Sequence, residues 1–122
     1  MIMKIEALVR EDKLEDVKEA LNEIDVNGFT VSQVMGCGVQ KGYMEKIRGS
    51  DVEAWMNPKI KFEIVVPDRE WADRVIEAVR KSAFTGEIGD GKIFLYQVEE
   101  VMRIRTGETG YCAIHSCNEN EV

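Results

Sequence analysis

The sequence has little of what would place the chain in a membrane or on a nucleic acid. No apolar run approaches the length of a membrane-spanning helix, and the N-terminus Met1-Ile2-Met3-Lys4 has no signal-peptide pattern. The formal net charge is −7, whereas nucleic-acid binding needs clustered Lys and Arg. We therefore expect a cytoplasmic protein that binds no nucleic acid and meets a membrane only through a partner.

Cysteine and histidine are too few and too scattered to build a scaffold. Cys37, Cys112 and Cys117 are an odd, widely spaced set, so a disulfide framework is not expected in a reducing compartment. His115 and the two tail cysteines lack partners at metal-ligand spacing, so no zinc site is predicted. A chain of 122 residues is expected to fold as one domain around a single modest core.

What the sequence does have is a strand–helix–strand pattern that occurs twice. Apolar residues alternate in four segments, which predict strands, and recur at helical spacing in two others, which predict amphipathic helices. Asp12 and Asp68 are the expected N-terminal caps of the two helices, and Asn27-Gly28 is the expected end of the first. The predicted strands are residues 2–10, 29–35, 59–66 and 92–98.

The two halves also match residue by residue, because Lys4, Glu6 and Val9 correspond to Lys61, Glu63 and Val66. A repeated β-α-β unit predicts an α+β, ferredoxin-like sandwich, in which both helices cover one face of a four-stranded antiparallel sheet. The other face is then uncovered. An open apolar face of that size usually finds a partner, so homo-oligomerisation is expected.

The glycine-rich segment at residues 85–92 is the most informative part of the chain. Gly86 to Lys92 fits the G-x-x-x-x-G-K part of a P-loop, but Ile93 stands where that motif has Ser or Thr. The segment also runs from helix to strand, so no helix N-terminus faces a phosphate. Backbone amides can still converge on an anion, and Lys92 adds a charge. A phosphate nest and a simple turn both remain open.

Two further segments favour a binding function. Arg103 and Arg105 would point to the same side of an extended segment, and guanidinium groups suit phosphate. With Lys92 they predict a site for a small polyanion, although a solvated cationic edge is the common meaning of three such residues. Residues 36 to about 58 are a long polar stretch, and loops of that length are usually functional or disordered.

Together these segments resemble the P-II family of nitrogen-regulatory signal proteins over essentially the whole chain to about residue 114. The motifs that carry the resemblance, in order, are Gly36-x-Gly38-x-Gln40-Lys41-Gly42, Arg48-Gly49, Lys61-x-Glu63-Ile64-Val65-Val66-Pro67, Thr85-Gly86-x-Ile88-Gly89-Asp90-Gly91-Lys92-Ile93-Phe94 and Arg103-Ile104-Arg105-Thr106-Gly107-Glu108. The resemblance implies a domain over residues 1–114, with a T-loop at about 39–56, a B-loop at 85–92, a C-loop at 103–110 and a flexible tail at 115–122.

The resemblance also implies a homotrimer that binds ATP or ADP between neighbouring chains, and 2-oxoglutarate together with Mg²⁺. The residues that it places at the nucleotide are Thr30, Gly36, Gly38, Glu63, Val65, Gly89, Asp90, Gly91, Lys92, Arg103 and Arg105. Of these, Lys92 and the two arginines would hold the phosphates. The residues that it places at 2-oxoglutarate are Gln40, Lys41, Gly42, Lys59 and Gly89, and Gln40 would also bind Mg²⁺.

The function that the resemblance implies is signalling of nitrogen, carbon and energy status without catalysis. The T-loop would contact an ammonium channel, glutamine synthetase or nitrogenase, with Arg48 at the partner and Ser50 as a possible modification site. Val39 replaces the usual Arg, and Val52 stands where many members carry a uridylylated tyrosine, so that switch is not expected. A nitrogenase switch-off type of the same family, or a weak ATPase or phosphotransferase, are the alternatives.

Overall fold

The structure, a computed structural model, describes residues 1–39 and 54–115, with only the backbone described at residues 38, 39, 54 and 55. Its four strands form one antiparallel sheet in the order β2-β3-β1-β4. The elements are β1 (Met3–Arg10), the 3₁₀ helix η1 (Glu11–Lys13), α1 (Leu14–Glu23), β2 (Thr30–Val39), β3 (Ala54–Val66), α3 (Arg69–Ala83), β4 (Lys92–Gln97) and α4 (Tyr111–Ile114).

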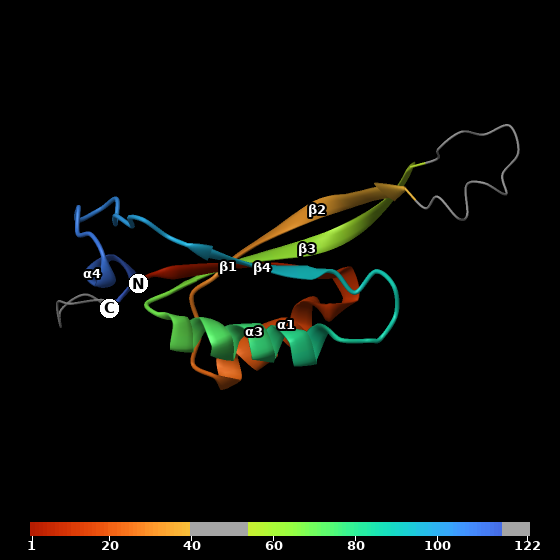
Figure 1. Ribbon diagram of the computed structural model, residues 1–122, viewed down its shortest axis with the longest axis horizontal. Helices are drawn as coiled ribbons and strands as arrows, with labels where there is room; N and C mark the ends of the chain where they lie inside the picture. The colour runs from red at the N-terminus through yellow and green to blue at the C-terminus, as the bar shows by residue number, and fades with distance from the viewer. Residues whose placement is uncertain (40–53, 116–122) are drawn as a thin grey trace, which may run out of the picture.

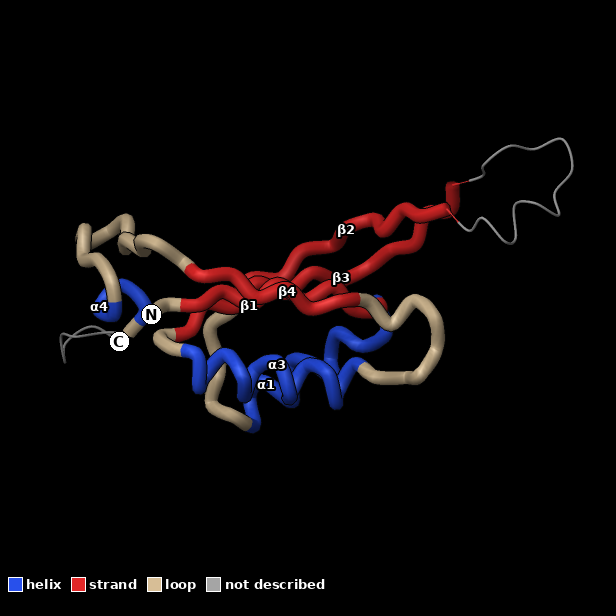
Figure 2. The backbone as a smooth tube through the Cα atoms, in the orientation of Figure 1, coloured by secondary structure: helices blue, strands red, loops and turns tan. Residues whose placement is uncertain are grey.

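The long helices α1 and α3 lie side by side on one face of this sheet (Figure 1). Figure 2 shows the same two layers, with the sheet on one side and both helices on the other. This confirms the predicted α+β, ferredoxin-like architecture. Within the described residues, no helix has both the length and the apolar character to cross a bilayer.

The core lies between the two layers and follows from the alternation in β1 and β3. Every second residue of β1 is buried, from Met3 to Val9, because successive side chains of a strand point to opposite faces. Phe62 of β3 is fully buried at the centre, and Leu21 of α1 and Val75 of α3 meet it from the helix layer. The stripes of apolar residues therefore fix which face of each element turns inward.

The helix ends show one confirmed prediction and two wrong ones. The Asp68 carboxylate accepts a hydrogen bond of 2.9 Å from the Trp71 amide, so Asp68 caps α3 as predicted. Asp12 does not cap α1, because the chain first makes the 3₁₀ turn η1 and no side chain caps either helix there. Nor does α1 reach Asn27-Gly28: it ends at Glu23, and Asp25 takes the left-handed conformation with φ 64°.

The strands β2 and β3 extend well beyond the predicted residues 29–35 and 59–66. Residues 36–39 pair with residues 54–57 in a two-stranded ribbon, so part of the polar stretch is regular structure. Figure 1 shows this ribbon projecting past the helix layer. Gln40, Lys41, Gly42, Arg48 and Ser50 lie outside the described residues.

The uncovered face of the sheet is charged at its centre, so the expectation of an apolar face is wrong there. Lys4 forms an ion pair of 2.8 Å with Glu63, and Lys61 lies 3.8 Å from Glu6. The hydrogen bond between Lys4 and Glu63 lowers the pKa of the Glu63 carboxyl and raises that of the Lys4 ammonium. The outward positions of β1 and β3 therefore satisfy one another across the strands.

The cysteines differ from one another. Cys37 is an exposed free thiol on β2. Cys112 is disulfide-bonded, so the expectation of reduced thiols is wrong for this residue.

Candidate functional site

The loop between α3 and β4, residues 85–91, is organised by the carboxylate of Asp90; we call it the glycine loop. One oxygen of Asp90 accepts hydrogen bonds of 2.9 Å from the backbone amides of Thr85 and Gly86. The other accepts from the Thr85 hydroxyl and, at 2.9 Å, from Nε of Arg10. The bonds from Thr85, followed by that from Arg10, hold the pKa of the Asp90 carboxyl well below its usual range.

Two cations of the sheet hold the far side of the glycine loop. Arg10 also donates to the carbonyl of Ile88 at 2.9 Å, and the Lys59 ammonium donates to the carbonyl of Gly89. Arg10 and Lys59 are partners in the register of β1 and β3, so they reach the loop from neighbouring strands. Sequence reasoning missed Arg10. The only signal was a cation at the end of an alternating strand.

Glycine is required where this loop returns to the sheet. Gly91 has φ +103°, and a Cβ there would lie 1.8 Å from the carbonyl oxygen of Leu8. Gly89 has φ +102°, and its Cβ would lie 3.4 Å from Nη2 of Arg10. The glycines therefore let the loop pass against β1 in a conformation that other residues rarely adopt.

A cavity of about 300 Å³ lies between the glycine loop and the sheet. Gly36 adjoins this region, because a Cβ at Gly36 would lie 3.3 Å from Cγ of Lys59. Gly36 and the Gly89 carbonyl thus both lie beside the side chain of Lys59. The lining residues of the cavity are Arg10, Glu11, Asp12, Asn57, Pro58, Lys59, Ile88 and Gly89.

Three of the residues that the resemblance places at the nucleotide share the uncovered face of the sheet. Thr30 and Glu63 are partners in the register of β2 and β3, and Val65 lies two residues further along β3 on the same face. The Glu63 carboxylate is engaged by Lys4 in this structure. Contact of these residues with a nucleotide stays a prediction, as it does for Gly36, Gly38 and Asp90.

The predicted pair of arginines does not join this site within one chain. β4 begins beside the glycine loop at Lys92 and spans about 17 Å, at roughly 3.4 Å per residue, before the chain reaches Arg103. Figure 1 shows the segment after β4 at the opposite end of the sheet from the glycine loop. Proximity of Lys92, Arg103 and Arg105 in the sequence is therefore not proximity in the folded chain.

The segment at residues 101–110 is also not extended; we call it the arginine turn. Residues 104–106 form a turn, and Met102 bridges to Thr109. The guanidinium of Arg103 lies 3.4 Å from the Glu108 carboxylate and donates to the carbonyl of Ala113 at 3.4 Å. Arg103 and Arg105 consequently do not alternate as residues of a strand do.

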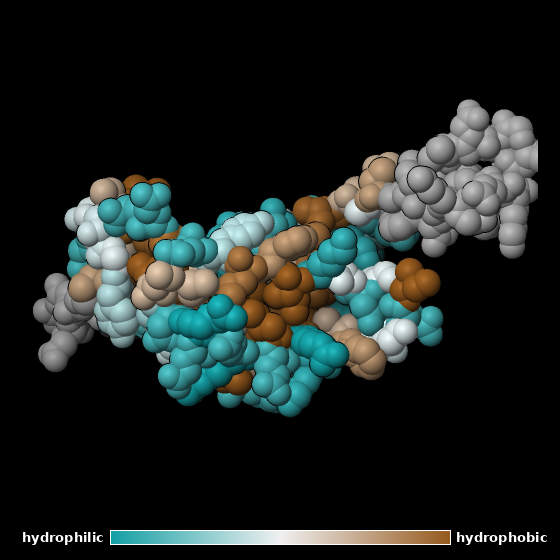
Figure 3. Space-filling view, viewed as in Figure 1, coloured by the Kyte–Doolittle hydropathy of each residue, from teal (hydrophilic) through white to brown (hydrophobic). Residues whose placement is uncertain are grey.

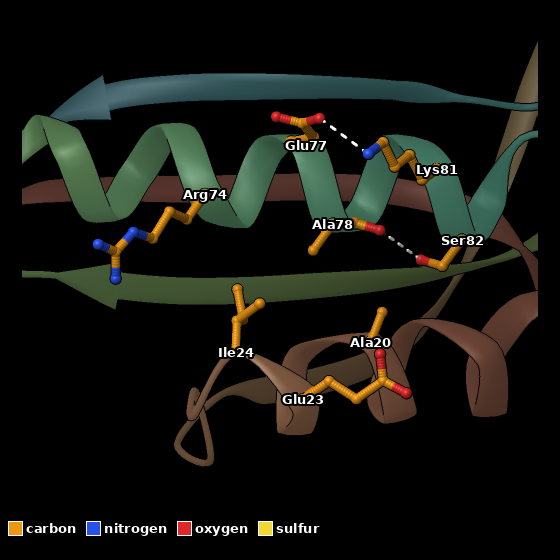
Figure 4. Close-up of a pocket in the computed structure, with 8 residues that line it drawn as sticks. All are labelled: Ala20, Glu23, Ile24, Arg74, Glu77, Ala78, Lys81 and Ser82. Atoms are coloured by element: carbon orange, nitrogen blue, oxygen red, sulfur yellow. Dashed lines mark hydrogen bonds and ion pairs between the residues drawn. The ribbon is translucent and has the colours of Figure 1, made fainter.

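A groove elsewhere on the molecule uses none of the predicted site residues. It lies between α1 and α3 and has a volume of about 530 Å³ (Figure 4). Small side chains such as Ala20, Ala78 and Ser82 line it, with Glu77 and Lys81 paired at 3.0 Å beside them. Among residues 1–39 and 54–115, no group of three His, Cys, Asp or Glu side chains could hold a metal ion.

Comparisons with known proteins agree on one family. A family model of the nitrogen regulatory protein P-II matches residues 2–108. The nitrogen regulatory protein P-II of Rhizobium meliloti is 54% identical over 111 residues, which are 91% of this chain and 98% of the relative. The protein of the same name from Haemophilus influenzae is 50% identical over the same shares.

Solved structures give the same result. The structure of B. subtilis GlnK matches with a TM-score of 0.78 and 39% identity, over 92% of this chain and 97% of that chain. The B. subtilis GlnK–ATP complex matches with a TM-score of 0.77 and 37% identity, over 92% of this chain and 94% of that chain. The chain belongs to the P-II family of nitrogen regulatory proteins.

Proposed function

We propose that the protein binds ATP or ADP at the glycine loop and the adjoining face of the sheet, and acts as a signalling protein, not as an enzyme. The observation that carries the proposal is the glycine loop itself. Asp90, Arg10 and Lys59 set the shape of this loop, and its Gly91 lies against the Leu8 carbonyl of β1. The similarity to a GlnK–ATP complex supports the nucleotide as ligand.

The phosphate site is completed by a second copy of the chain in a homotrimer. Arg103 and Arg105 belong at the phosphates with Lys92, but the two groups lie at opposite ends of β4 in one chain (Figure 1). A contact between one chain's glycine loop and the next chain's arginine turn is head-to-tail, and such contacts form a ring when the rotation between neighbouring chains closes, as in a trimer. The arginines of each chain would then serve its neighbour's nucleotide.

The edge strand β4 supports such an association. Among the described residues, β4 pairs only with β1, so its outer edge is open. Phe94 and Tyr96 on this strand are 39% and 41% exposed, and Ile93 and Leu95 are only partly buried. Figure 3 shows apolar side chains gathered around this edge. An open apolar edge of this kind favours a second chain.

The effector of this site is 2-oxoglutarate, bound together with Mg²⁺-ATP. Lys59 would pair with a carboxylate of the acid after releasing the Gly89 carbonyl, and Gln40 would bind the acid and Mg²⁺. The neighbouring Lys41 and Gly42 would complete the site. Because Gly89 belongs to both the nucleotide site and the effector site, the two ligands would affect each other's binding.

The output is a change of partner through residues 39–56. Arg48 would contact the partner, and Ser50 is a possible modification site. The candidate targets are an ammonium channel, glutamine synthetase or nitrogenase, reached from the cytoplasm.

Calorimetry tests this function. ATP should bind the wild-type protein and bind more tightly when 2-oxoglutarate and Mg²⁺ are present. Lys92→Ala should weaken ATP binding, whereas Lys81→Ala, which removes an exposed lysine of α3, should not. Absence of ATP binding would show that the proposal is wrong. An ATP affinity that does not change with 2-oxoglutarate would show that 2-oxoglutarate is not the effector.

A further inference from the structure

The cavity that contains Lys59 and Gly89 is also lined by two carboxylates, Glu11 and Asp12. Both belong to the 3₁₀ turn η1, which follows β1 directly after Arg10. Asp12 is not engaged as a helix cap, since no side chain caps η1 or α1. Its side chain therefore lines the cavity without a capping role.

Both cations of the cavity donate hydrogen bonds to the glycine loop. Arg10 donates to Asp90 and to the Ile88 carbonyl, and Lys59 donates to the Gly89 carbonyl. Within the part of the chain that the structure describes, neither Glu11 nor Asp12 forms an ion pair. Both acidic side chains are exposed.

An anion that enters this cavity thus meets two negative charges, and it must compete with the Gly89 carbonyl for Lys59 and with Asp90 and the Ile88 carbonyl for Arg10. Repulsion between like charges near solvent is modest, but it is larger for a dianion than for a monoanion. The effect should also fall with ionic strength, because exposed charges are screened.

We propose that Glu11 and Asp12 are specificity-determining residues that weaken the binding of a dicarboxylate at Lys59 and so shift the response to higher effector concentrations. This inference rests on the proposed function, because it concerns the affinity of the same effector site. The turn η1, which sequence reasoning took for a helix cap, is on this account part of the ligand cavity.

The test measures 2-oxoglutarate affinity by calorimetry at saturating Mg²⁺-ATP for wild type, Glu11→Gln, Asp12→Asn and the double variant. Each single variant should bind the acid roughly two- to five-fold more tightly, as expected for one exposed charge. The double variant should gain more, and the gain should shrink in high salt. Glu19→Gln, an exposed change on α1 with the same change of net charge, is the control and should bind like wild type.

The outcomes separate this inference from the proposed function. If ATP and 2-oxoglutarate bind but the cavity variants match Glu19→Gln, the inference is wrong and the proposed function stands. If ATP does not bind any form, the proposed function fails first. If only the double variant binds the acid measurably, the inference is supported. If ATP binds and no form binds the acid, both the inference and the choice of effector are overturned.

Discussion

The two ends of β4 carry two loops that are built on the same principle and anchored differently. In the glycine loop the carboxylate of Asp90 accepts from Arg10, which lies 80 residues away in the sequence. In the arginine turn the carboxylate of Glu108 accepts from Thr106 at 2.9 Å and lies 3.4 Å from Arg103, only five residues away. The first loop is tied to strands of the sheet, whereas in the second Arg103 reaches Glu108 of the same turn and the Ala113 carbonyl of α4.

This difference explains how each chain can carry two parts of a site that meet only between neighbouring chains. A loop tied to two strands presents a fixed surface. A turn that is closed by its own side chains can be placed against another molecule without losing its shape. The contrast predicts that changes in the glycine loop cost stability of the whole domain, and that changes in the arginine turn mainly cost binding.

The largest expected effect is that of Gly91→Ala. Its Cβ would lie 1.8 Å from the Leu8 carbonyl oxygen at φ +103°, so β1 or β4 must move. We expect a loss on the order of 4 kcal/mol in the free energy of unfolding, from overpacking and backbone strain together. Urea unfolding measures it.

The matched control is Gly107→Ala in the arginine turn, with φ +76° and no atom within 4 Å of the added Cβ. Backbone strain alone predicts a loss of about 1 to 2 kcal/mol. Equal losses for the two variants would contradict the proposed difference between the loops.

Arg10→Met should have the next largest effect. The change keeps much of the apolar stem but removes the hydrogen bonds to Asp90 and Ile88. We expect the free energy of unfolding to fall by about 2 kcal/mol, since one of these bonds joins two charged groups. Arg69→Met removes an exposed ion pair with Asp73 on α3 and should cost about 0.5 kcal/mol. A smaller loss for Arg10→Met than for Arg69→Met would show that Arg10 does not anchor the loop.

The smallest effect concerns acid stability. Hydrogen bonds lower the pKa of Asp90 in the folded protein, so its contribution is complete above the ordinary Asp pKa of about 3.9. That contribution is lost as the pH falls below this value toward the lowered pKa. Asp90→Asn should therefore show a shallower loss of thermal stability below about pH 4 than wild type. An unchanged profile for Asp90→Asn would contradict this role.

The sequence predicted those parts of the fold that depend on local pattern. Alternation in residues 2–10 and 59–66 placed both central strands, and the Asp68 cap formed because its partner, the Trp71 amide, is three residues away. Asp12 failed as a cap because a 3₁₀ turn competes with the start of α1. The helix α1 ends before Gly28, where its end was expected. Asp25 takes the left-handed conformation instead, which Asp tolerates better than most residues.

Parts that depend on pairing between distant segments were missed. Residues 36–39 contain two glycines and residues 54–57 contain Ala and Asn, which are depleted in strands, yet their mutual register makes a ribbon. Arg10 belongs to no recognisable sequence motif, because its partners Asp90 and Ile88 lie about 80 residues away. Lys92 and Arg103 looked like one cluster because the length of β4 between them does not show in their spacing.

Mixing subunits of Lys92→Ala and Arg105→Ala tests whether one nucleotide site is shared between two chains. Each variant alone should bind ATP weakly. In randomly mixed rings about a quarter of the interfaces combine an intact Lys92 with a neighbour's intact Arg105, and these should bind ATP with wild-type affinity. If the mixture binds no better than the separate variants, the two residues act within one chain, and the account is contradicted.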